Sequence, residues 1–433
     1  MNVAAEASVT YGALITFQTP RLLLGENATQ EIGFELRRLG VRSTLIVTDP
    51  TVARIGLPER IRNLLDAEGI KAKIIEGAQI EPTDEGCQAL ANSIAGTEVE
   101  SFVAVGGGSA IDTAKVLNLL LSFPGATLHD YVNRPIGRGR SVPGPLKPFV
   151  AVPTTAGSGS ECTAMVALGI AGLNVKTGIA DRALTPTLAI VDPLNTVTVP
   201  AAVTAAGGFD VLTHACESYT ARAYDRRPAY QSPADRPIYI GANPISDIWA
   251  EHALKLLGEY FVRAVLNPDD IEARTAMSHA AVYAGMGFGN SGTHIPHACA
   301  YPIAGLVTKY RPRDYEVEHA MVPHGEAVVV TAPAAFEYTY DACPERHLRA
   351  AELLGASLSG ITTRSGTDVL PGTISALIQA TGGPPGISTF GFDRKDIPAL
   401  VEGAVKQTRL LSGCPRVAGP EQITRILEAS LGD

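Results

Sequence analysis

Several features that would assign this chain to a class are scarce or missing. Positive charge is not in excess, because 35 lysine and arginine residues are set against 44 aspartate and glutamate residues, a net charge of −9. We therefore expect neither nucleic acid nor a membrane surface as a partner, since both need a basic patch. The six cysteines include no Cys-x-x-Cys pair, which excludes a small disulfide-stapled protein and indicates reduced thiols.

The start of the chain also lacks a targeting signal. The segment MNVAAEASVTYGALITF has no basic region followed by a long apolar stretch, so we recognise no signal peptide. No targeting leader is recognised either. The sequence therefore predicts a cytoplasmic location.

Charge is missing altogether from one continuous stretch. Residues 275–308 contain no aspartate, glutamate, lysine or arginine, and the length of this stretch alone would permit a membrane span. Glycine, proline, asparagine and histidine interrupt it, and no apolar run reaches the roughly 20 residues that a span needs. We predict a deeply buried segment of a soluble protein. The histidines within it, His279, His294 and His297, point to a functional site.

What is present fits a globular chain of more than one domain. The length is 433 residues, of which 45% are apolar and 18% charged. Up to about residue 200, short β-rich runs alternate with helical ones, which predicts a parallel sheet covered by helices on both faces. Longer runs with a 3.6-residue period follow. We predict an α/β domain over residues 1–199 and an all-α domain over residues 200–433, with the boundary near Val199.

Two turns rich in glycine and hydroxyl groups each follow a predicted strand. Residues 106–115 read GGGSAIDTAK, and residues 153–161 read PTTAGSGSE. Backbone N–H groups in such turns bind a diphosphate, although tight turns also use glycine for purely steric reasons. Two such turns at neighbouring strand ends predict a nucleotide crevice. Asp49 directly follows the predicted strand 44–48. Its carboxylate could bind the ribose of NAD, cap the N-terminus of the next helix, or do both.

A second set of residues suits a metal ion. Asp210 and His214 are four residues apart on a predicted helix and therefore share one face. The uncharged stretch adds His297, and the segment PHG adds His324. One carboxylate with three imidazoles suits Fe(II), Zn or Mn. An Asp-x3-His pair alone is more often a contact on a helix surface, but burial among alanine and glycine favours the metal site.

Taken together, these motifs resemble the iron-containing (group III) alcohol dehydrogenase family. The resemblance rests on GGGSAIDTAK, PTTAGSGSE, LAIVDP, GFDVLTHACESY, HIPHACAYPIAG and PHGE, in family order, and covers nearly the whole chain. It implies an N-terminal Rossmann-like α/β domain and an all-α C-terminal domain, a fold also found in dehydroquinate synthase. It implies NAD and a divalent metal, Fe(II) before Zn, in the cleft between them. It also implies a homodimer or larger homo-oligomer acting on small molecules.

The resemblance implies a set of site residues. Metal ligands fall on Asp210, His214, His297 and His324. Cofactor contacts fall on Asp49, Gly106, Gly107, Gly108, Ser109, Asp112, Thr154, Thr155, Ser158, Ser160, Lys176 and Leu188. Many family members carry a histidine four residues after the third ligand, where this chain has Tyr301, whose hydroxyl either replaces that histidine in catalysis or only packs. We expect His294 to support the ligands rather than bind the metal.

A closer resemblance is to one subgroup, the hydroxyacid–oxoacid transhydrogenases. It rests on ANPISDIWA at residues 242–250, NPDDIEAR at 267–274 and PERHL at 344–348. It implies oxidation of 4-hydroxybutyrate and reduction of 2-oxoglutarate through a bound nicotinamide. A substrate carboxylate needs a cation, and as a group the candidates are Arg226, Arg227, Arg236, Lys309, Arg311 and Arg313.

Other functions remain as alternatives. A general primary alcohol or aldehyde dehydrogenase of the same family fits the same motifs. A dehydroquinate-synthase-like lyase is less expected, because the uncharged stretch offers no lysine or arginine for a phosphorylated substrate. A non-catalytic NAD-binding protein is disfavoured because all four expected metal ligands, one aspartate and three histidines, are present.

Overall fold

A six-stranded parallel sheet forms the N-terminal part of the protein. The computed structural model describes residues 13–172, 175–230 and 232–432, so the first twelve residues, where we recognised no signal peptide, lie outside the described part. The strand order is β1-β8-β5-β4-β2-β3. The strands are β1 (Arg21–Leu24), β2 (Ser43–Thr48), β3 (Lys71–Glu76), β4 (Ser101–Gly106), β5 (Phe149–Pro153) and β8 (Leu188–Val191).

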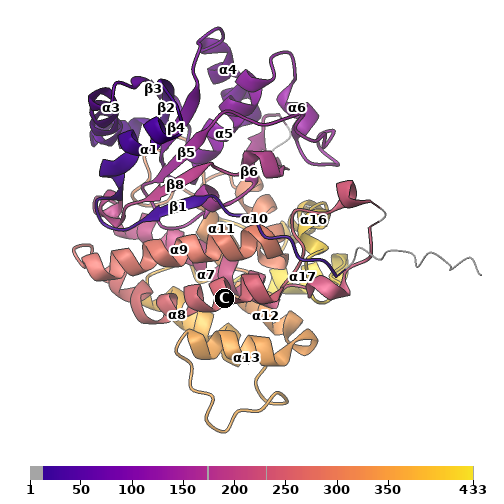
Figure 1. Ribbon diagram of the computed structural model, residues 1–433. Helices are drawn as coiled ribbons and strands as arrows, with labels where there is room; N and C mark the ends of the chain where they lie inside the picture. Colours follow the sequence, from indigo (N-terminus) through magenta and orange to yellow (C-terminus); the bar gives the residue numbers. More distant parts are fainter. Residues whose placement is uncertain (1–12, 173–174, 231, 433) are drawn as a thin grey trace, which may run out of the picture.

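Helices cover both faces of this sheet (Figure 1). Along β2, Leu45 and Val47 face the layer that contains α4 and α5, whereas Ile46 faces α1 and α3. Burial on both faces explains why the central strands are continuous apolar runs rather than alternating ones. The helices of this part are α1 (Ile32–Arg38), α2 (Pro50–Arg54), α3 (Leu57–Ala67), α4 (Asp84–Ser93), α5 (Gly108–Ser122) and α6 (Leu128–Tyr131).

The structure differs from the expected elements in two places. The single helix predicted from residue 52 to 66 is two helices, α2 and α3, because Gly56 lies between them with a positive φ of 79°. The antiparallel hairpin of β6 (Met165–Ile170) and β7 (Val175–Ala180) was not predicted. It lies outside the main sheet and packs against α5 and α10.

The C-terminal part is helical, as predicted. Its helices are α7 (Ala201–Thr220), α8 (Pro244–Leu266), α9 (Ile271–Ser291), α10 (Ile295–Leu306), α11 (His324–Val329), α12 (Ala332–Thr339), α13 (Pro344–Leu353), α14 (Val369–Ala380), α15 (Ile397–Val405), α16 (Thr408–Leu411) and α17 (Pro420–Ala429). The last main-sheet strand ends at Val191 and α7 begins at Ala201, so the division near Val199 stays a prediction.

The uncharged stretch forms most of α9 and α10. These two helices are almost entirely buried, which confirms the prediction of a buried segment. Small residues allow close packing here: a Cβ atom on Gly285 would lie 3.1 Å from the Cα of Gly159. In the described part of the chain, no helix combines the length and the apolar character that crossing a membrane requires.

Lys115 connects α5 to the segment that follows β5. Its ammonium group is fully buried and donates hydrogen bonds to the carbonyl oxygens of Ser160, Thr163 and Met165, at 2.7, 2.9 and 2.8 Å. A buried charge is tolerated only when such partners replace water. The two glycine-rich turns are therefore held at a fixed distance from each other.

Replacing Lys115 by methionine is expected to destabilise the protein by about 3–5 kcal/mol, because three buried carbonyl groups lose their donor and Asp112 its nearest cation. Urea unfolding followed by intrinsic fluorescence measures this loss. The matched control is Lys395→Met, at an exposed lysine that pairs with Asp393, for which we expect a change within about 0.5 kcal/mol. Equal losses for the two variants would contradict this account of Lys115.

Candidate active site

A cleft of about 430 Å³ lies between the carboxyl ends of the strands and the helical part. Parallel strands bring these ends to one edge, where ligands bind in such sheets. From the sheet side it is lined by Asp49, Gly107, Gly108, Ser109, Asp112, Thr154, Thr155, Ser158 and Lys176, and from the helical side by Asp210, Tyr301 and His324. Most of the residues expected at the cofactor and the metal therefore share one cavity.

The glycine turn at the start of α5 is in close contact with the hydroxyl-rich turn. A Cβ atom on Gly108 would lie 2.4 Å from the Oγ of Ser158, so no larger residue fits at this position. The first N–H groups of α5 face the cleft from this turn. They provide donors and positive dipole charge for an anion.

Asp49 has one carboxylate oxygen in use and one that faces the glycine turn. Its Oδ1 accepts hydrogen bonds from the backbone N–H groups of Thr51 and Val52, at 2.9 and 3.0 Å, and so caps α2. Its Oδ2 is directed toward Gly106, where a Cβ atom would lie 3.2 Å away. Helix capping and a ribose contact are therefore compatible at this residue.

Two of the expected cofactor residues, Asp112 and Ser160, also bind each other. The carboxylate of Asp112 accepts hydrogen bonds from the hydroxyl of Ser160 and from the backbone N–H of Ala167, the latter at 2.7 Å. The Ser160 hydroxyl also lies 3.1 Å from the ammonium of Lys115. Because their polar atoms bind each other, these side chains hold the two turns together.

Leu188 does not reach the cleft. It lies at the start of β8 between Arg21 of β1 and Val150 of β5, and its side chain is buried in the core of the sheet. Its expected place beside an adenosine is therefore not what the structure shows. Lys176 does line the cleft, where it forms an ion pair with Glu81.

Three side chains from three helices form a group that could hold a metal ion. Asp210 of α7, His297 of α10 and His324 of α11 each offer a ligand atom, and these atoms lie within 4.8 Å of one another. The Oδ1 of Asp210 is 3.7 Å from the Nε2 of His297 and 3.9 Å from the Nε2 of His324. Asp210 and His297 are buried, whereas His324 opens to the cleft.

The polar atoms of this group fit a cation. The Oδ1 of Asp210, the Nε2 of His297 and the Nδ1 of His214 are buried and have no hydrogen-bond partner among the described residues. Leaving such atoms unpaired costs about 1–3 kcal/mol each. A divalent ion would satisfy the carboxylate oxygen and the neutral nitrogen lone pairs together.

His214 lies beside the group rather than in it. Its Nδ1 is 3.6 Å from the Oδ1 of Asp210. Its ring stacks on Phe288 with centroids 3.7 Å apart, and on His297 with centroids 4.5 Å apart. His214 would need a shift of this stacked ring to join the other three ligand candidates.

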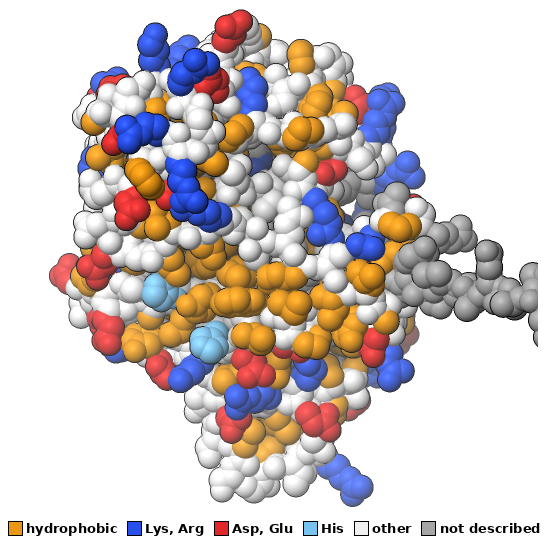
Figure 2. Space-filling view, viewed as in Figure 1, with side chains coloured by type: hydrophobic (Ala, Val, Ile, Leu, Met, Phe, Trp, Pro, Cys, Tyr) orange, Lys and Arg blue, Asp and Glu red, His pale blue; other side chains and the backbone are white. Residues whose placement is uncertain are grey.

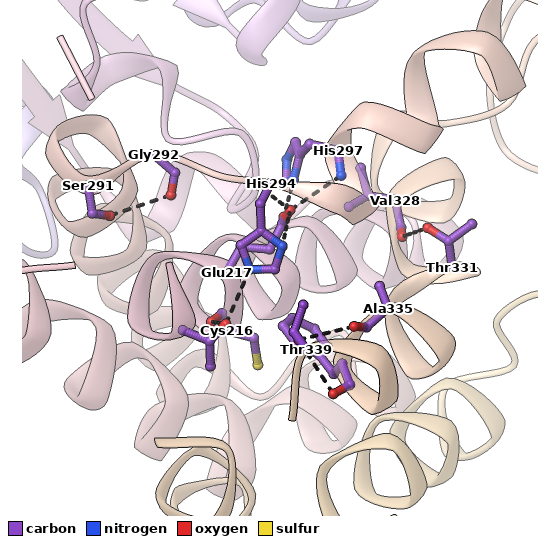
Figure 3. Close-up of polar contacts among 12 residues, drawn as sticks. Cys216, Glu217, Ser291, Gly292, His294, His297, Val328, Thr331, Ala335 and Thr339 are labelled. Atoms are coloured by element: carbon purple, nitrogen blue, oxygen red, sulfur yellow. Dashed lines mark hydrogen bonds and ion pairs between the residues drawn. The ribbon is translucent and has the colours of Figure 1, made fainter. Parts of the chain in front are cut away.

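Glu217 is a site residue that sequence reasoning missed. It is completely buried on α7, and its carboxylate accepts hydrogen bonds from the Nδ1–H of His297 and from the backbone N–H of His294, the latter at 2.7 Å (Figure 3). A carboxylate on one ring nitrogen fixes the tautomer and directs the other nitrogen to a metal. The signal was present in the spacing, because Asp210, His214 and Glu217 recur on one helix face.

His294 contacts this carboxylate from another side. Its Nε2 lies 3.2 Å from the hydroxyl of Thr220, and its Nδ1 is 3.8 Å from Glu217. The edge of its ring meets Phe336. His294 is not part of the three-residue group, in keeping with the supporting role expected for it.

The histidines of the group differ in their pKa. Burial lowers the pKa of His214 to about 3 and that of His324 to about 4, so both rings are neutral at pH 7. Burial alone would also lower the pKa of His297, but the carboxylates of Glu217 and Asp210 outweigh it and raise this pKa to about 9. Burial would raise the pKa of Asp210, yet the surrounding histidines keep it below its usual value.

Comparison with known proteins agrees with this geometry. Residues 19–193 match the family described as "Iron-containing alcohol dehydrogenase", and residues 238–431 match "Fe-containing alcohol dehydrogenase family, C-terminal". The chain belongs to the iron-containing alcohol dehydrogenase family. The resemblance predicted from the motifs is thus confirmed, as are the fold class and the assignment as an oxidoreductase.

Individual members of the family give more detail. The chain is 45% identical to the mitochondrial hydroxyacid–oxoacid transhydrogenase of Xenopus tropicalis, over 94% of this chain and 88% of that protein. A solved 1,3-propanediol oxidoreductase superposes with a TM-score of 0.84 at 28% identity, covering 96% and 100% of the two chains. A sulfoacetaldehyde reductase from Bifidobacterium kashiwanohense, solved in complex with NAD+, superposes with a TM-score of 0.78 at 26% sequence identity. This match covers 96% of the present chain and 99% of the reductase.

One expectation has to be corrected. The sequence, without a recognisable leader, predicted a cytoplasmic location. The transhydrogenases of this family to which the chain is similar are mitochondrial, in Xenopus tropicalis and in Homo sapiens alike. The cytoplasmic prediction is therefore wrong.

Zinc affinity is expected to rise with pH. His297 must lose a proton before its Nε2 can bind a metal, whereas His214 and His324 are already neutral. Because the pKa of His297 is about 9, the affinity should increase about tenfold per pH unit between pH 6.5 and 8.5. Competition with a chromogenic chelator measures it.

The matched variant is Glu217→Gln, which keeps the shape of the side chain but removes the charge that raises this pKa. We expect a flatter pH dependence and, at pH 8.5, an affinity about 10–100-fold below that of the unchanged protein. An affinity of the unchanged protein that does not vary with pH would refute the role assigned to the Glu217–His297 pair.

Proposed function

We propose that this chain is a hydroxyacid–oxoacid transhydrogenase. It would transfer hydride from 4-hydroxybutyrate or a similar hydroxy acid to a bound nicotinamide, and from there to 2-oxoglutarate. The observation that carries this proposal is that one cleft has the glycine turns and Asp49 at one end and Asp210 with His324 at the other. The 45% identity to the transhydrogenase of Xenopus tropicalis supports the choice within the family.

We propose Asp210, His214, His297 and His324 as ligands of Fe(II) or, as the second choice, Zn. The unpaired buried atoms of Asp210, His214 and His297 support this assignment. When bound, such a metal supplies Lewis acidity, which lowers the pKa of an alcohol and polarises a carbonyl. Asp210 is the only negative charge among these ligands, so the ligand set does not cancel the charge of a dication.

We propose NAD as the cofactor, at the turn residues that line the cleft. The N–H groups at the start of α5 would bind the diphosphate, with Thr154, Thr155 and Ser158 contributing polar contacts. The free Oδ2 of Asp49 would accept the ribose hydroxyls and repel a 2′-phosphate, which favours NAD over NADP. The nicotinamide would accept the hydride, and the chain would align the nicotinamide ring with the substrate.

The helical wall keeps water out of the reaction. α9 packs against α7, which carries Asp210, and α9 and α10 are almost entirely buried, so we expect charges at this end of the cleft to be only weakly screened. Burial raises the pKa of Tyr301, so its hydroxyl stays protonated at neutral pH. Tyr301 therefore acts in this proposal as a hydrogen-bond donor and not as a base.

Two wider features remain part of this proposal. The division into domains at 1–199 and 200–433 follows from the change between sheet and helices. A homodimer or larger homo-oligomer is supported by the band of apolar side chains over α8 and α9 in Figure 2. Ile245, Ile248 and Leu266 of α8 are exposed, and apolar surface of this kind marks association sites.

The test mixes the purified, metal-loaded chain with 4-hydroxybutyrate and 2-oxoglutarate, without added nicotinamide. We expect 2-hydroxyglutarate to form, as measured by mass spectrometry. Reduction of added NAD by simple alcohols, with no 2-hydroxyglutarate formed, would instead make the chain a general alcohol dehydrogenase.

Two histidine variants test the site assignment in the same assay. His297→Ala is expected to lower the rate by at least about 100-fold and to abolish metal retention. The matched control is His279→Ala, at a histidine of the same uncharged stretch whose ring lies beside Tyr283 and away from the cleft. Equal rates for the two variants would contradict the assignment.

A further inference from the structure

A second cavity adjoins the active-site cleft. It has a volume of about 220 Å³ and lies between β7, α10, α15 and α16. Lys176 and Tyr301 line both this cavity and the cleft. The two cavities therefore meet at these two side chains.

The second cavity is rich in positive charge. Its cationic residues are Arg134, Lys176, Lys406 and Arg409, and the one carboxylate in its lining is Glu402. Most of the cations already have partners: Lys406 donates to Glu402 at 2.8 Å, and Lys176 pairs with Glu81. The Nε of Arg134 donates to a backbone carbonyl oxygen at 3.0 Å.

Arg409 is the exception. Its Nη1 is buried and has no hydrogen-bond partner among the described residues, which also provide no carboxylate in a salt bridge with it. Its guanidinium group lies over the ring of Tyr239, 5.0 Å from the centroid. This contact, together with a hydrogen bond that Arg409 donates to the hydroxyl of Tyr239, fixes the plane of the guanidinium group while Nη1 keeps no partner among the described residues.

Arg409 lies close to the metal candidates through Tyr301. The ring of Tyr301 is 6.4 Å from that of His324, measured between centroids. Burial raises the pKa of Tyr301, and the positive charge of Arg409 opposes this rise, so the two side chains are near enough to interact. Tyr301 is thus near both Arg409 and His324.

We propose that Arg409 binds the carboxylate of the substrate in the second cavity, while the reacting carbon stays at Asp210, His297 and His324. This inference rests on the proposed function and names its substrate class. A planar guanidinium with a free donor suits a carboxylate better than a lysine would. In both 4-hydroxybutyrate and 2-oxoglutarate, a pair of methylene groups separates the reacting carbon from a carboxylate, so one cation serves both half-reactions.

The cations considered from the sequence do not serve this purpose. Arg226, Lys309, Arg311 and Arg313 are exposed. Arg227 donates to the carbonyl oxygen of Tyr239, and Arg236 donates to the hydroxyl of Tyr230 at 3.0 Å. None of the six lines the cleft or the second cavity in the described part of the chain.

The experiment compares 4-hydroxybutyrate with 1-butanol, which has the same chain length but no carboxylate. In Arg409→Ala, the ratio of kcat/KM for the acid to kcat/KM for the alcohol should fall on the order of 100-fold, mainly through KM, because a desolvated ion pair is lost. Arg409→Lys should restore part of this ratio. Arg425→Ala is the matched control, since it removes an equal charge that is paired with Glu421 on α17 and lines neither cavity, and it should leave the ratio unchanged.

A titration with succinate separates binding from turnover. Succinate carries the carboxylates but cannot be oxidised as an alcohol, so calorimetry reports only its affinity for the metal- and NAD-loaded protein. We expect weaker binding to Arg409→Ala, again on the order of 100-fold, and unchanged binding to Arg425→Ala. Equal succinate affinity for Arg409→Ala and the unchanged protein overturns the inference, as does an equal loss for both variants.

Failure of the proposed function gives a different result from failure of the inference about Arg409. An unchanged protein that oxidises 1-butanol but not 4-hydroxybutyrate refutes the proposed function, whereas the succinate titration still decides the role of Arg409. Thermal unfolding of each variant with NADH bound verifies that the fold is retained. A loss of activity toward both substrates in a folded Arg409→Ala protein also overturns the inference, because it would indicate general damage to the site.

Discussion

The candidate site depends on the buried carboxylate of Asp210. Asp210 lies on α7, and residues 275–308, which include the ligand candidate His297, contain no aspartate, glutamate, lysine or arginine. Such a carboxylate is costly unless cationic partners surround it. The protonated ring of His297 fills that role, the neutral rings of His214 and His324 lie beside the same carboxylate, and Glu217 binds the far side of His297. The geometry of α7, α10 and α11 follows from this arrangement.

A second buried charge organises the cofactor half in a similar way. Lys115 binds three carbonyl groups of the segment after β5, and Asp112 binds the same segment through a hydroxyl and a backbone N–H. These contacts occupy side chains that a motif-based interpretation assigned to the cofactor. They leave the backbone N–H groups of the turns free to face the cleft. The motif GGGSAIDTAK therefore connects α5 to the segment after β5, in addition to presenting backbone N–H groups to the cleft.

The sequence predicted the sheet and the ligand candidates because their signals are local. Central strands buried on both faces give continuous apolar runs, and Asp210 with His214 shows helical spacing. Glu217 was missed although its helical spacing with Asp210 and His214 was a local signal, whereas Arg409 escaped prediction because its place beside Tyr301 arises only when distant segments meet. Nothing near Arg409 in the sequence indicates that α16 packs beside Tyr301. Leu188 was expected beside the adenosine as the first residue of the LAIVDP motif, but its side chain points into the core of the sheet.

The most direct test of the central claim is anomalous diffraction from crystals of the chain loaded with Fe(II) or Zn. The account predicts one strong peak about 2.0–2.2 Å from the Oδ1 of Asp210 and from the Nε2 atoms of His297 and His324. It also predicts that the ring of His214 moves toward that peak. A strong peak elsewhere, or no peak between these residues at full metal loading, would contradict the account.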